Sequence, residues 1–419
     1  MKCDLLVLGG GAAGIAAAVT AARQGARVVL IERSGMLGGM ATAALVHTVC
    51  GLYFLREEPG AVVAHSGFPA EFARRLIEAG AATAPVRMGR VDVLPHSPPG
   101  FAFVADTVVS ECPSLEVFLH SELIHAEMDG IRIAEVTAIC RGVIMTFRPA
   151  AAIDASGDAL LVALCGRECD QAPSERLQRP ALIFALHGVD AGRLGDDGRL
   201  QVARLLTSGV QGGALDSGVL GAHFRATGRG GEVYVTIDLA APLFDPTSPA
   251  QLTALEKTGR ILAREILVHL RKNHEAFRSA DVFAFPARVG IRESRRIRGR
   301  ATVTGDDIIR GTAHVDVVAL GTWPMELREK ATGPKWRFPD GLRPTQIPLG
   351  ALRPSGIENC WTAGRCISCE HEAQASLRVI ATCMATGQAA GAAAALQAQD
   401  GIVPDAAAVR ALIRMEAPQ

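Results

Sequence analysis

The residues best suited to chemistry near the N-terminus are a run of glycines and one acid. Residues 9–14 read Gly-Gly-Gly-Ala-Ala-Gly, which fits G-x-G-x-x-G, and Glu32 follows 18 residues after Gly14. In this pattern Gly9 permits a tight turn, Gly11 lets the backbone approach a pyrophosphate, and Gly14 lets a helix pack on a strand. The N–H groups at the start of that helix would bind the phosphates, and Glu32 would bind ribose hydroxyls. The spacing predicts a dinucleotide site.

A second group with chemical potential is a cluster of arginines in the middle of the chain. Guanidinium groups bind carboxylates and phosphates through two hydrogen bonds, so the cluster could clamp a substrate or a cofactor. Alternatively, the arginines form a salt-bridged turn with the nearby acids Glu293, Asp306 and Asp307. We favour the structural interpretation for most of them and expect one or two to reach a ligand, with Arg296 as the catalytic candidate. The cluster comprises Arg288, Arg292, Arg295, Arg296, Arg298 and Arg300.

Cys366 and Cys369 form a C-x-x-C pattern that has two functional interpretations. The pair could be a redox dithiol or half of a four-thiolate metal site. The sequence contains no second C-x-x-C that would complete such a metal site. We therefore expect structural thiols at these positions and no bound metal.

The elements around the glycine run follow the order that a nucleotide-binding unit requires. Residues 5–8 (Leu-Leu-Val-Leu) form a short apolar run, typical of a strand buried on both faces of a parallel sheet. A helical pattern follows to Gln24, and residues 28–31 (Val-Val-Leu-Ile) predict a second strand that ends at Glu32. This order predicts an α/β fold with a Rossmann-type domain, but it does not distinguish NAD from FAD.

Length and composition exclude several classes of protein. The chain has 419 residues, 49% of them hydrophobic and 21% charged, which suits a globular protein of two interleaved domains. Its formal net charge is zero, so no overall field would attract nucleic acid or an anionic membrane. Asp4 and several glycines interrupt the apolar residues 1–22, which makes a signal peptide or membrane span a poor interpretation. Ten scattered cysteines then indicate reduced thiols and a cytoplasmic location.

Two further segments resemble elements of flavoproteins. Residues 37–42 (Leu-Gly-Gly-Met-Ala-Thr) contain a second glycine pair and resemble the extension that follows the first acid in flavoproteins of the glutathione-reductase structural class. A glycine pair permits close backbone approach to a cofactor, although an ordinary turn would also explain it. Residues 149–158 end in Ile-Asp-Ala-Ser-Gly-Asp, which is similar to the "IDATGD" element of FAD-dependent oxidoreductases with serine in place of threonine.

The C-terminal third completes the resemblance to the bacterial FAD-dependent oxidoreductase family. Residues 363–368 (Ala-Gly-Arg-Cys-Ile-Ser) resemble the family's "AGRCIS" element, and residues 346–349, 294–297 and 387–391 match further segments in the family's order. The resemblance implies FAD as the cofactor. It also implies a set of cofactor-binding residues: Gly9, Gly11, Ala12, Ala13, Gly14, Glu32, Arg33, Gly38, Gly39, Met40, Ala41, Thr42, Leu123, Ala155, Ser156, Gly157, Gly364, Arg365, Ala375 and Ser376.

The resemblance also places several reactive side chains beside the flavin. His371 is the first candidate for a catalytic base, because a neutral imidazole can take the proton that accompanies hydride loss. His47 and Cys50 follow the second glycine pair and could line the active site or even attach FAD covalently, although packed side chains are the simpler interpretation. If the final helix begins near Ala375 and Ser376, its positive end could point at the flavin, although a purely structural role would also explain it.

These features together predict a discontinuous architecture. We expect an FAD-binding domain formed by residues 1–171 and 340–419 and an inserted α+β substrate domain formed by residues 172–339. The sequence has no second G-x-G-x-x-G and no cysteine pair at disulfide-reductase spacing, so electrons are expected to come from a small organic substrate by hydride transfer to flavin N5. Dioxygen, a quinone or a partner protein would reoxidise the flavin, and a homo-oligomer is compatible with the sequence. The alternatives are an electron-transfer subunit with a redox partner and a non-enzymatic binding protein.

Overall fold

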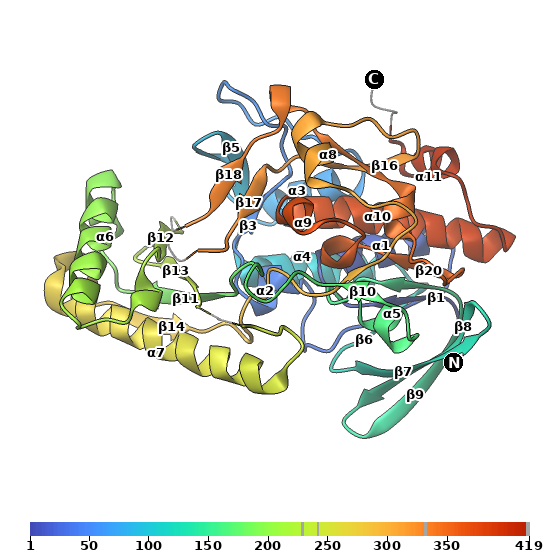
Figure 1. Cartoon of the computed structure of the whole chain (residues 1–419), viewed down its shortest axis with the longest axis horizontal. Coiled ribbons are helices and arrows are strands. Elements are labelled where there is room, and N and C mark those ends of the chain that lie inside the picture. Colours follow the sequence, from blue (N-terminus) through green and yellow to red (C-terminus); the bar gives the residue numbers. More distant parts are fainter. Residues whose placement is uncertain (228–229, 241–242, 331–332, 416–419) are drawn as a thin grey trace.

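A central sheet, a layer of helices and a second, smaller sheet make up the molecule (Figure 1). The computed structural model describes residues 1–227, 230–240, 243–330 and 333–415. The strands are β1 (Lys2–Leu8), β2 (Val28–Ile31), β3 (Thr48–Val49), β4 (Val86–Met88), β5 (Val91–Pro95), β6 (Leu115–Phe118), β7 (Glu122–Asp129), β8 (Arg132–Cys140), β9 (Val143–Asp154), β10 (Cys169–Asp170), β11 (Ala181–His187), β12 (His223–Ala226), β13 (Val233–Asp238), β14 (Asp281–Ala284), β15 (Arg296–Ile297), β16 (Val317–Gly321), β17 (Met325–Leu327), β18 (Lys335–Arg337), β19 (Thr345–Pro348) and β20 (Cys360–Thr362). The helices are α1 (Ala12–Arg23), α2 (Met40–Ala43), α3 (Phe68–Glu78), α4 (Pro98–Ser110), α5 (Leu160–Leu164), α6 (Asp196–Gln211), α7 (Pro249–Asn273), α8 (Gly305–Arg310), α9 (His371–Leu377), α10 (Ile380–Asp400) and α11 (Ala406–Ile413).

The central sheet is of the predicted Rossmann type. Strands β6, β2, β1, β9 and β20 run parallel in that order, so β1 lies between β2 and β9. The first part of β9 pairs antiparallel with β8, and β8 pairs with β7, which adds a meander to the sheet. The strands predicted at residues 5–8 and 28–31 are therefore confirmed, as is the helix between them.

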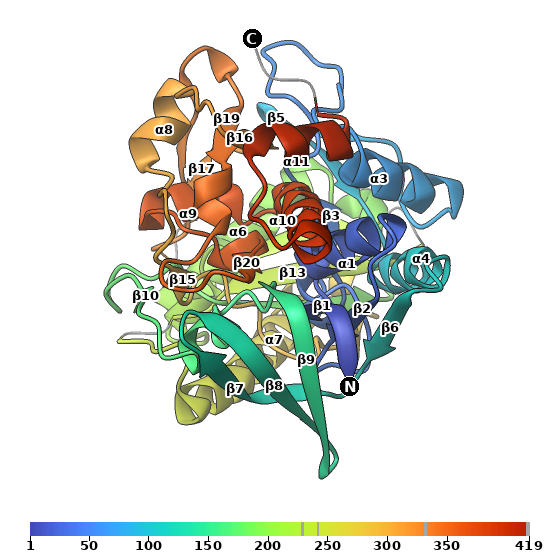
Figure 2. The same cartoon turned by 90° about the vertical axis from the view of Figure 1, so that its right-hand side faces the viewer.

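Alternation along the strands divides the apolar side chains between two cores. On β1, Leu5 and Val7 face a core formed with α1 and α10, whereas Leu6 and Leu8 face a core formed with the β7–β9 meander. Figure 2 shows α1 and α10 on one side of the sheet and the meander on the other. Because both faces are buried, the strands need continuous apolar runs, which explains the Leu-Leu-Val-Leu pattern of the sequence.

The helix α10 packs directly on the backbone of α1. A Cβ atom added to Gly387 would lie 2.1 Å from the carbonyl oxygen of Ala13, and one added to Gly391 would lie 2.3 Å from that of Ala17. Glycine is therefore required at both positions for the two helices to lie this close. The small residues of α10 therefore allow the two helices to pack closely.

The segment predicted to begin the last helix is in fact a separate short helix. The sequence suggested one helix beginning near Ala375 and Ser376, but α9 ends at Leu377 and α10 begins at Ile380, with a 94° bend between them. Val379 adopts an extended conformation that breaks the helical hydrogen bonding. The N-terminus of the long helix therefore lies four to five residues later than predicted.

The second sheet has the order β12-β13-β11-β14 and is antiparallel throughout. One face packs on α6 and α7 in a core that draws on residues 172–289. Val303, Ile308 and Val318, which were expected in the inserted domain, instead pack in the core around α1 and α10. The part of the chain from residue 303 onward therefore packs largely with the nucleotide-binding unit, ahead of the boundary predicted at residue 340.

No single helix in the described parts of the chain is both long enough and apolar enough to cross a membrane. The bent pair α9–α10 meets the criteria of length and composition when its two helices are taken together.

We predict that Gly387→Ala lowers the free energy of unfolding. Overpacking in a close contact costs about 1–3 kcal/mol, whereas alanine favours a helix over glycine by about 1 kcal/mol, so a net loss would reveal the contact with Ala13. Denaturant unfolding measures the change. In the control variant Gly195→Ala, the new Cβ would have no atom within 4 Å, and its stability should stay within about 0.5 kcal/mol of the wild type. Equal stability of both variants would contradict the packing argument.

Candidate active site

Two glycine turns far apart in the sequence form one surface. The Gly38 N–H donates a hydrogen bond of 2.8 Å to the carbonyl oxygen of Gly10. A Cβ atom on Gly39 would lie only 2.8 Å from the Cα atom of Gly11. The second glycine pair therefore lies against the first glycine turn.

The turns after β9 and β20 reach the same place. A Cβ atom on Gly9 would lie 2.6 Å from the carbonyl oxygen of Ala155, and one on Gly364 would lie 2.9 Å from the Cβ atom of Ala13. The Gly364 N–H donates a hydrogen bond of 3.1 Å to Oγ1 of Thr386 in α10. The carboxyl ends of parallel strands meet at one edge of a sheet, which brings these turns together.

This edge can accept a pyrophosphate. The helix α1 begins at Gly11 without a side-chain cap, so its first N–H groups remain available to an anion. A Cβ atom added to Gly11 would meet no atom closer than 3.9 Å, which leaves open space beside its backbone. Glycine turns, open space and an uncapped helix N-terminus are the features that the diphosphate of FAD requires.

Arginines near the turns add positive charge. Arg365 forms an ion pair of 2.6 Å with Asp158, and Arg33 lies 3.6 Å from the same carboxylate. The Nε atom of Arg288 is buried and has no hydrogen-bond partner among the described residues. Burial and the neighbouring Arg33 lower the pKa of Arg288, against the opposing effect of Glu32. A buried guanidinium without a hydrogen bond at Nε can bind a phosphate, which places Arg288 among the residues that could hold the cofactor.

Glu32 is held in a fixed position at the end of β2. Its carboxylate accepts hydrogen bonds of 2.7 Å from the backbone N–H groups of Gly10 and Ser34, and the residue is buried. A carboxylate offers about four acceptor positions. Two positions therefore remain for ribose hydroxyls, and the role predicted for Glu32 stays compatible with this geometry.

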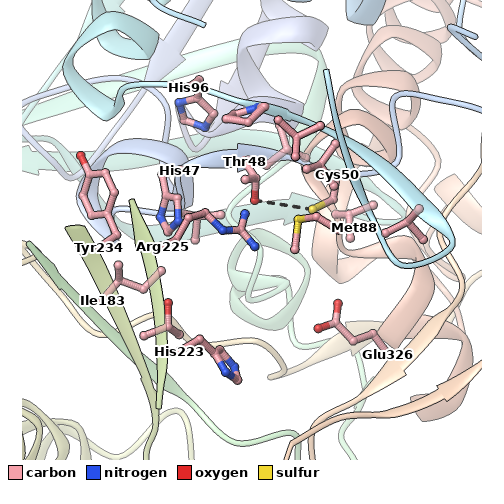
Figure 3. A pocket seen from close by; sticks show the side chains of 18 of the residues that line it. His47, Thr48, Cys50, Met88, His96, Ile183, His223, Arg225, Tyr234 and Glu326 are labelled. Carbon is pink, nitrogen blue, oxygen red and sulfur yellow. Dashed lines mark hydrogen bonds between the residues drawn. The ribbon is translucent and has the colours of Figure 1, made fainter. Parts of the chain in front are cut away.

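A cavity of about 1350 Å³ begins beside these turns at Met40 and Arg365. Its wall includes parts of residues 40–50, 80–97, 222–227, 232–236, 323–328, 334–338 and 378–380, together with Arg292. Pockets for single small ligands usually measure about 300–1,000 Å³. This cavity is therefore large enough for a flavin ring and a substrate together, and Figure 3 shows the side chains that line it.

The second sheet supplies one wall of the cavity. His223 and Arg225 of β12 and Tyr234 and Thr236 of β13 line the cavity, whereas the alternate β13 residues Val233, Val235 and Ile237 belong to the core beneath. Successive side chains of a strand point to opposite faces of the sheet, so the alternation decides which residues reach the ligand. The alternation of β13 was visible in the sequence. The sequence did not indicate that the polar face of this strand lines a cavity.

His47 packs against this wall, and its ring is neutral at physiological pH. Its ring stacks on Tyr234 with centroids 4.4 Å apart, and Nδ1 lies 3.1 Å from the carbonyl oxygen of Leu45. A carbonyl only accepts, so Nδ1 carries the proton and Nε2 is an acceptor in the neutral ring. Burial and the nearby Arg225 lower the pKa of His47 to about 3. His47 is therefore neutral at physiological pH, and its Nε2 makes no hydrogen bond with any described residue.

Ion pairs fix two of the cavity arginines, Arg292 and Arg328. Asp238 accepts hydrogen bonds of 2.7 Å from Arg292 and 2.8 Å from Arg328, and Glu326 pairs with Arg328 at 2.6 Å. Burial opposes ionisation of Asp238, but Arg292 and Arg328 outweigh it and lower its pKa to about 2. The carboxylates therefore stay charged and hold both guanidinium groups in place.

The candidates His371 and Arg296 lie together outside the cavity wall. Nδ1 of His371 lies 2.8 Å from Glu293 and Nε2 lies 3.0 Å from Glu329, while Arg296 also pairs with Glu293. Burial would lower the pKa of His371, but its hydrogen bonds and charge interactions with Glu293 and Glu329 raise it. Both ring nitrogens of His371 therefore have carboxylate partners, and the catalytic roles predicted for His371 and Arg296 stay predictions.

The other implied cofactor residues differ in their surroundings. Met40 and Arg365 line the cavity, but Ala375 and Ser376 are buried within α9, and the Ser376 hydroxyl donates to the carbonyl oxygen of Trp323. Arg378, Val379 and Ile380, at the start of α10, occupy the wall instead. The Leu123 side chain lies in the core beneath the meander, and the hydroxyls of Thr42 and Ser156 bond to neighbouring groups of their own turns.

The cysteines are not arranged for redox chemistry or metal binding. All ten are free thiols, and burial raises the pKa of Cys366 far above the usual range and that of Cys369 to about 12. Burial also raises the pKa of Cys50 in the cavity to about 11, so it stays protonated near neutral pH. No group of three or more His, Cys, Asp or Glu residues in the described ranges could hold a metal ion.

The most important residues that sequence reasoning missed are Arg225, Arg378 and Glu326. Arg225 and Glu326 both lie in short strands without a motif. Arg378 lies two residues after Ser376, near the predicted start of the final helix, so its position was a usable indication. The others face the cavity only because the second sheet folds against the nucleotide-binding unit.

Comparison with known proteins identifies the family. The family model described as "FAD dependent oxidoreductase" matches residues 4–415, nearly the whole chain. The chain belongs to the FAD-dependent oxidoreductase family. Members of this family use FAD, so FAD is the cofactor. The glycine turns, the N-terminus of α1 and Arg288 are suited to hold it. A comparison with curated proteins found no match.

Several solved structures resemble this FAD-dependent oxidoreductase distantly. A geranylgeranyl bacteriochlorophyll reductase-like protein from Thermoplasma acidophilum is 13% identical, with 99% of this chain and 83% of that chain covered and a TM-score of 0.49. The flavin-dependent brominase Bmp2 is 12% identical, with the same coverage and TM-score. PqsL from P. aeruginosa, in complex with 2-aminobenzoylacetate, is 14% identical, with 100% and 92% covered and a TM-score of 0.45. At this level of similarity no substrate or residue role transfers to this chain.

We predict that Asp238→Asn strongly destabilises the protein at neutral pH. Removal of one partner of a buried ion pair costs about 3–5 kcal/mol, and here two arginines lose their carboxylate. The stabilisation by Asp238 is present above its ordinary pKa of 3.8 and is lost as the pH falls through about 2. Denaturant unfolding at a series of pH values should therefore show a difference between wild type and variant that shrinks below pH 4. A variant as stable as the wild type at pH 7 would contradict this.

Proposed function

We propose that this protein oxidises a small organic substrate by hydride transfer to bound FAD in the cavity of about 1350 Å³. The observation that carries the proposal is the position of this cavity, which reaches Met40 and Arg365 next to the glycine turns and has polar side chains of the second sheet in its wall. An electron-transfer subunit would have little use for a cavity of this size and polarity. The reaction is written as loss of a hydride and a proton from the substrate, which forms a C=O or C=N bond.

The residues that would hold FAD are those at the edge of the central sheet. The backbone at Gly11 and the first N–H groups of α1 would bind the diphosphate with Arg288, and Glu32 would bind the ribose. When bound, FAD supplies a two-electron acceptor, which dioxygen, a quinone or a partner protein would reoxidise. The start of α10 at Val379 and Ile380 directs a positive helix end toward the cavity, which favours an electron-rich ligand there.

His47 is the best-placed group to take the substrate proton. Its Nε2 is an acceptor without a partner, and Tyr234 and Leu45 fix the orientation of the ring. A pKa of about 3 makes His47 a weak base in the protein alone. The O–H or N–H of a substrate becomes strongly acidic as hydride leaves, however, so a weak base in hydrogen-bond contact can accept that proton.

The test of the function is a search for the reductant. Purified protein should be yellow, and anaerobic addition of amines, hydroxy acids and sugars should include at least one compound that bleaches the flavin absorbance. A folded protein that contains no FAD would contradict the proposal. Flavin that is reduced only by a redox partner protein would favour the electron-transfer alternative.

With a bleaching compound in hand, His47→Gln should slow flavin reduction by about 10²–10⁴-fold, the usual contribution of a general base. His371→Gln provides the comparison, because it should reduce flavin at nearly the wild-type rate while it lowers thermal stability. Anaerobic stopped-flow absorbance measures both rates. The opposite ranking of the two variants would identify His371 as the base.

The proposed cofactor clamp predicts that Arg288→Gln weakens FAD binding. A hydrogen bond to a charged group contributes about 1.5–3 kcal/mol, which corresponds to roughly 10- to 150-fold in the dissociation constant. Flavin fluorescence of the diluted holoenzyme measures the loss. Arg310→Gln removes an exposed arginine that pairs with Asp306 and should leave the affinity unchanged. Equal affinities in both variants would exclude Arg288 from the cofactor site.

A further inference from the structure

Arg225 is a guanidinium in the cavity without a polar partner. It projects from β12 into the cavity between His47 and the side chains of Cys50 and Met88 (Figure 3). No described residue forms a hydrogen bond or ion pair with it. Burial and the nearby Arg199 and Arg328 disfavour its charged form, against the smaller opposing effects of Cys50 and Glu326 on its pKa. A partly buried cation in this state is stabilised by an anion from solution.

Arginines outnumber acids in the cavity wall. Among the described lining residues the acids are Glu232 and Glu326, whereas the basic ones are Arg87, Arg90, Arg199, Arg225, Arg292, Arg328, Arg365 and Arg378. Several of these arginines form ion pairs with acids, including Arg292 and Arg328 with Asp238. Among the described residues, the Arg378 guanidinium donates hydrogen bonds to the side chain of Gln178 and to a backbone carbonyl. Within the described ranges, Arg225 and Arg378 therefore leave two positive charges in the cavity without a carboxylate in ion-pair contact.

An apolar patch lies on the side of the cavity formed by residues 86–95 and 323–338. Met88 and Val93 line it together with three aromatic rings, Trp323, Trp336 and Phe338. Trp323 and Trp336 pack edge to face at 5.8 Å, and Trp336 stacks on Phe338 at 6.2 Å. Preformed aromatic surface of this kind binds the apolar body of a ligand.

We propose that the substrate is an organic carboxylate with an apolar or aromatic body, and that Arg225 binds its carboxylate while the aromatic wall holds its body. This inference rests on the proposed function, because it names the class of compound that the cavity oxidises. Arg225 lies on the second sheet and not among the glycine turns, so it belongs to the substrate side of the site. Arg378, at the start of α10, adds a second positive charge to the same cavity.

Substrate binding would also act on His47. Arg225 is one of the causes that hold the His47 ring neutral, since a second positive charge beside it is unfavourable. A carboxylate on Arg225 would offset that charge, so the ring becomes a better proton acceptor when the substrate is in place. A neutral compound of the same shape would not have this effect.

Benzoate and its neutral isostere benzamide test the inference. Isothermal titration of the holoenzyme should show benzoate binding about tenfold or more tightly than benzamide, because only the carboxylate pairs with Arg225. In Arg225→Gln the preference should disappear, and in Arg225→Lys part of it should remain. Arg298→Gln, which removes an exposed arginine paired with Asp170, is the matched control and should keep the full preference.

The outcomes separate the inference from the function on which it rests. Equal binding of the two probes, or a preference that survives in Arg225→Gln, would overturn the carboxylate assignment. FAD content and the melting temperature of each variant show whether the protein has folded, and the Lys variant retains the charge if the Gln variant does not fold. Suppose that neutral compounds reduce the flavin and that the holoenzyme shows no preference for benzoate. This result refutes the carboxylate inference and is still consistent with the proposed oxidation.

Discussion

The close contact between α10 and α1 determines how the rest of the site is assembled. Gly387 and Gly391 let the backbone of α10 lie against the carbonyl groups of α1, where any Cβ atom would overlap them. This contact brings Gly364, in the turn after β20, next to Ala13 at the start of α1, although some 350 residues separate them. A wider spacing of the two helices would separate the glycine turns and leave no continuous surface for a dinucleotide.

The same contact directs the start of α10 toward the cavity. Arg378, Val379 and Ile380 mark the bend between α9 and α10, and all three line the wall. Across the cavity, the alternation of β12 and β13 presents Arg225 and Tyr234, with their apolar neighbours buried beneath. The nucleotide-binding unit thus carries the glycine turns suited to FAD, and the second sheet presents polar side chains to the cavity. The ion pairs of Asp238 hold Arg292 and Arg328 in place, so the wall does not need a ligand to keep its shape.

The surroundings of the two candidate bases differ from what the sequence indicated. His371 was a reasonable base because an unperturbed imidazole titrates near neutral pH. Its partners Glu293 and Glu329 lie 78 and 42 residues away, however, and they convert it into part of a buried ion-pair cluster. His47 was only a secondary candidate for the active site, because no residue near it in the sequence indicates that its ring stacks on Tyr234. In both cases the deciding neighbours come from other elements of the fold.

The sequence by itself determined the glycine turns and the first strands of the nucleotide-binding unit. Turns, strands and helix starts depend on residues only a few positions apart. Glycines at 9, 11, 14, 38 and 39, the apolar runs of β1 and β2, and Glu32 at the end of β2 are local patterns with direct structural meanings. Only the tertiary structure decided which side chains face the cavity, which arginines are paired and which histidine stays neutral. Those properties depend on charges and burial contributed by segments hundreds of residues apart, and no local pattern encodes that proximity.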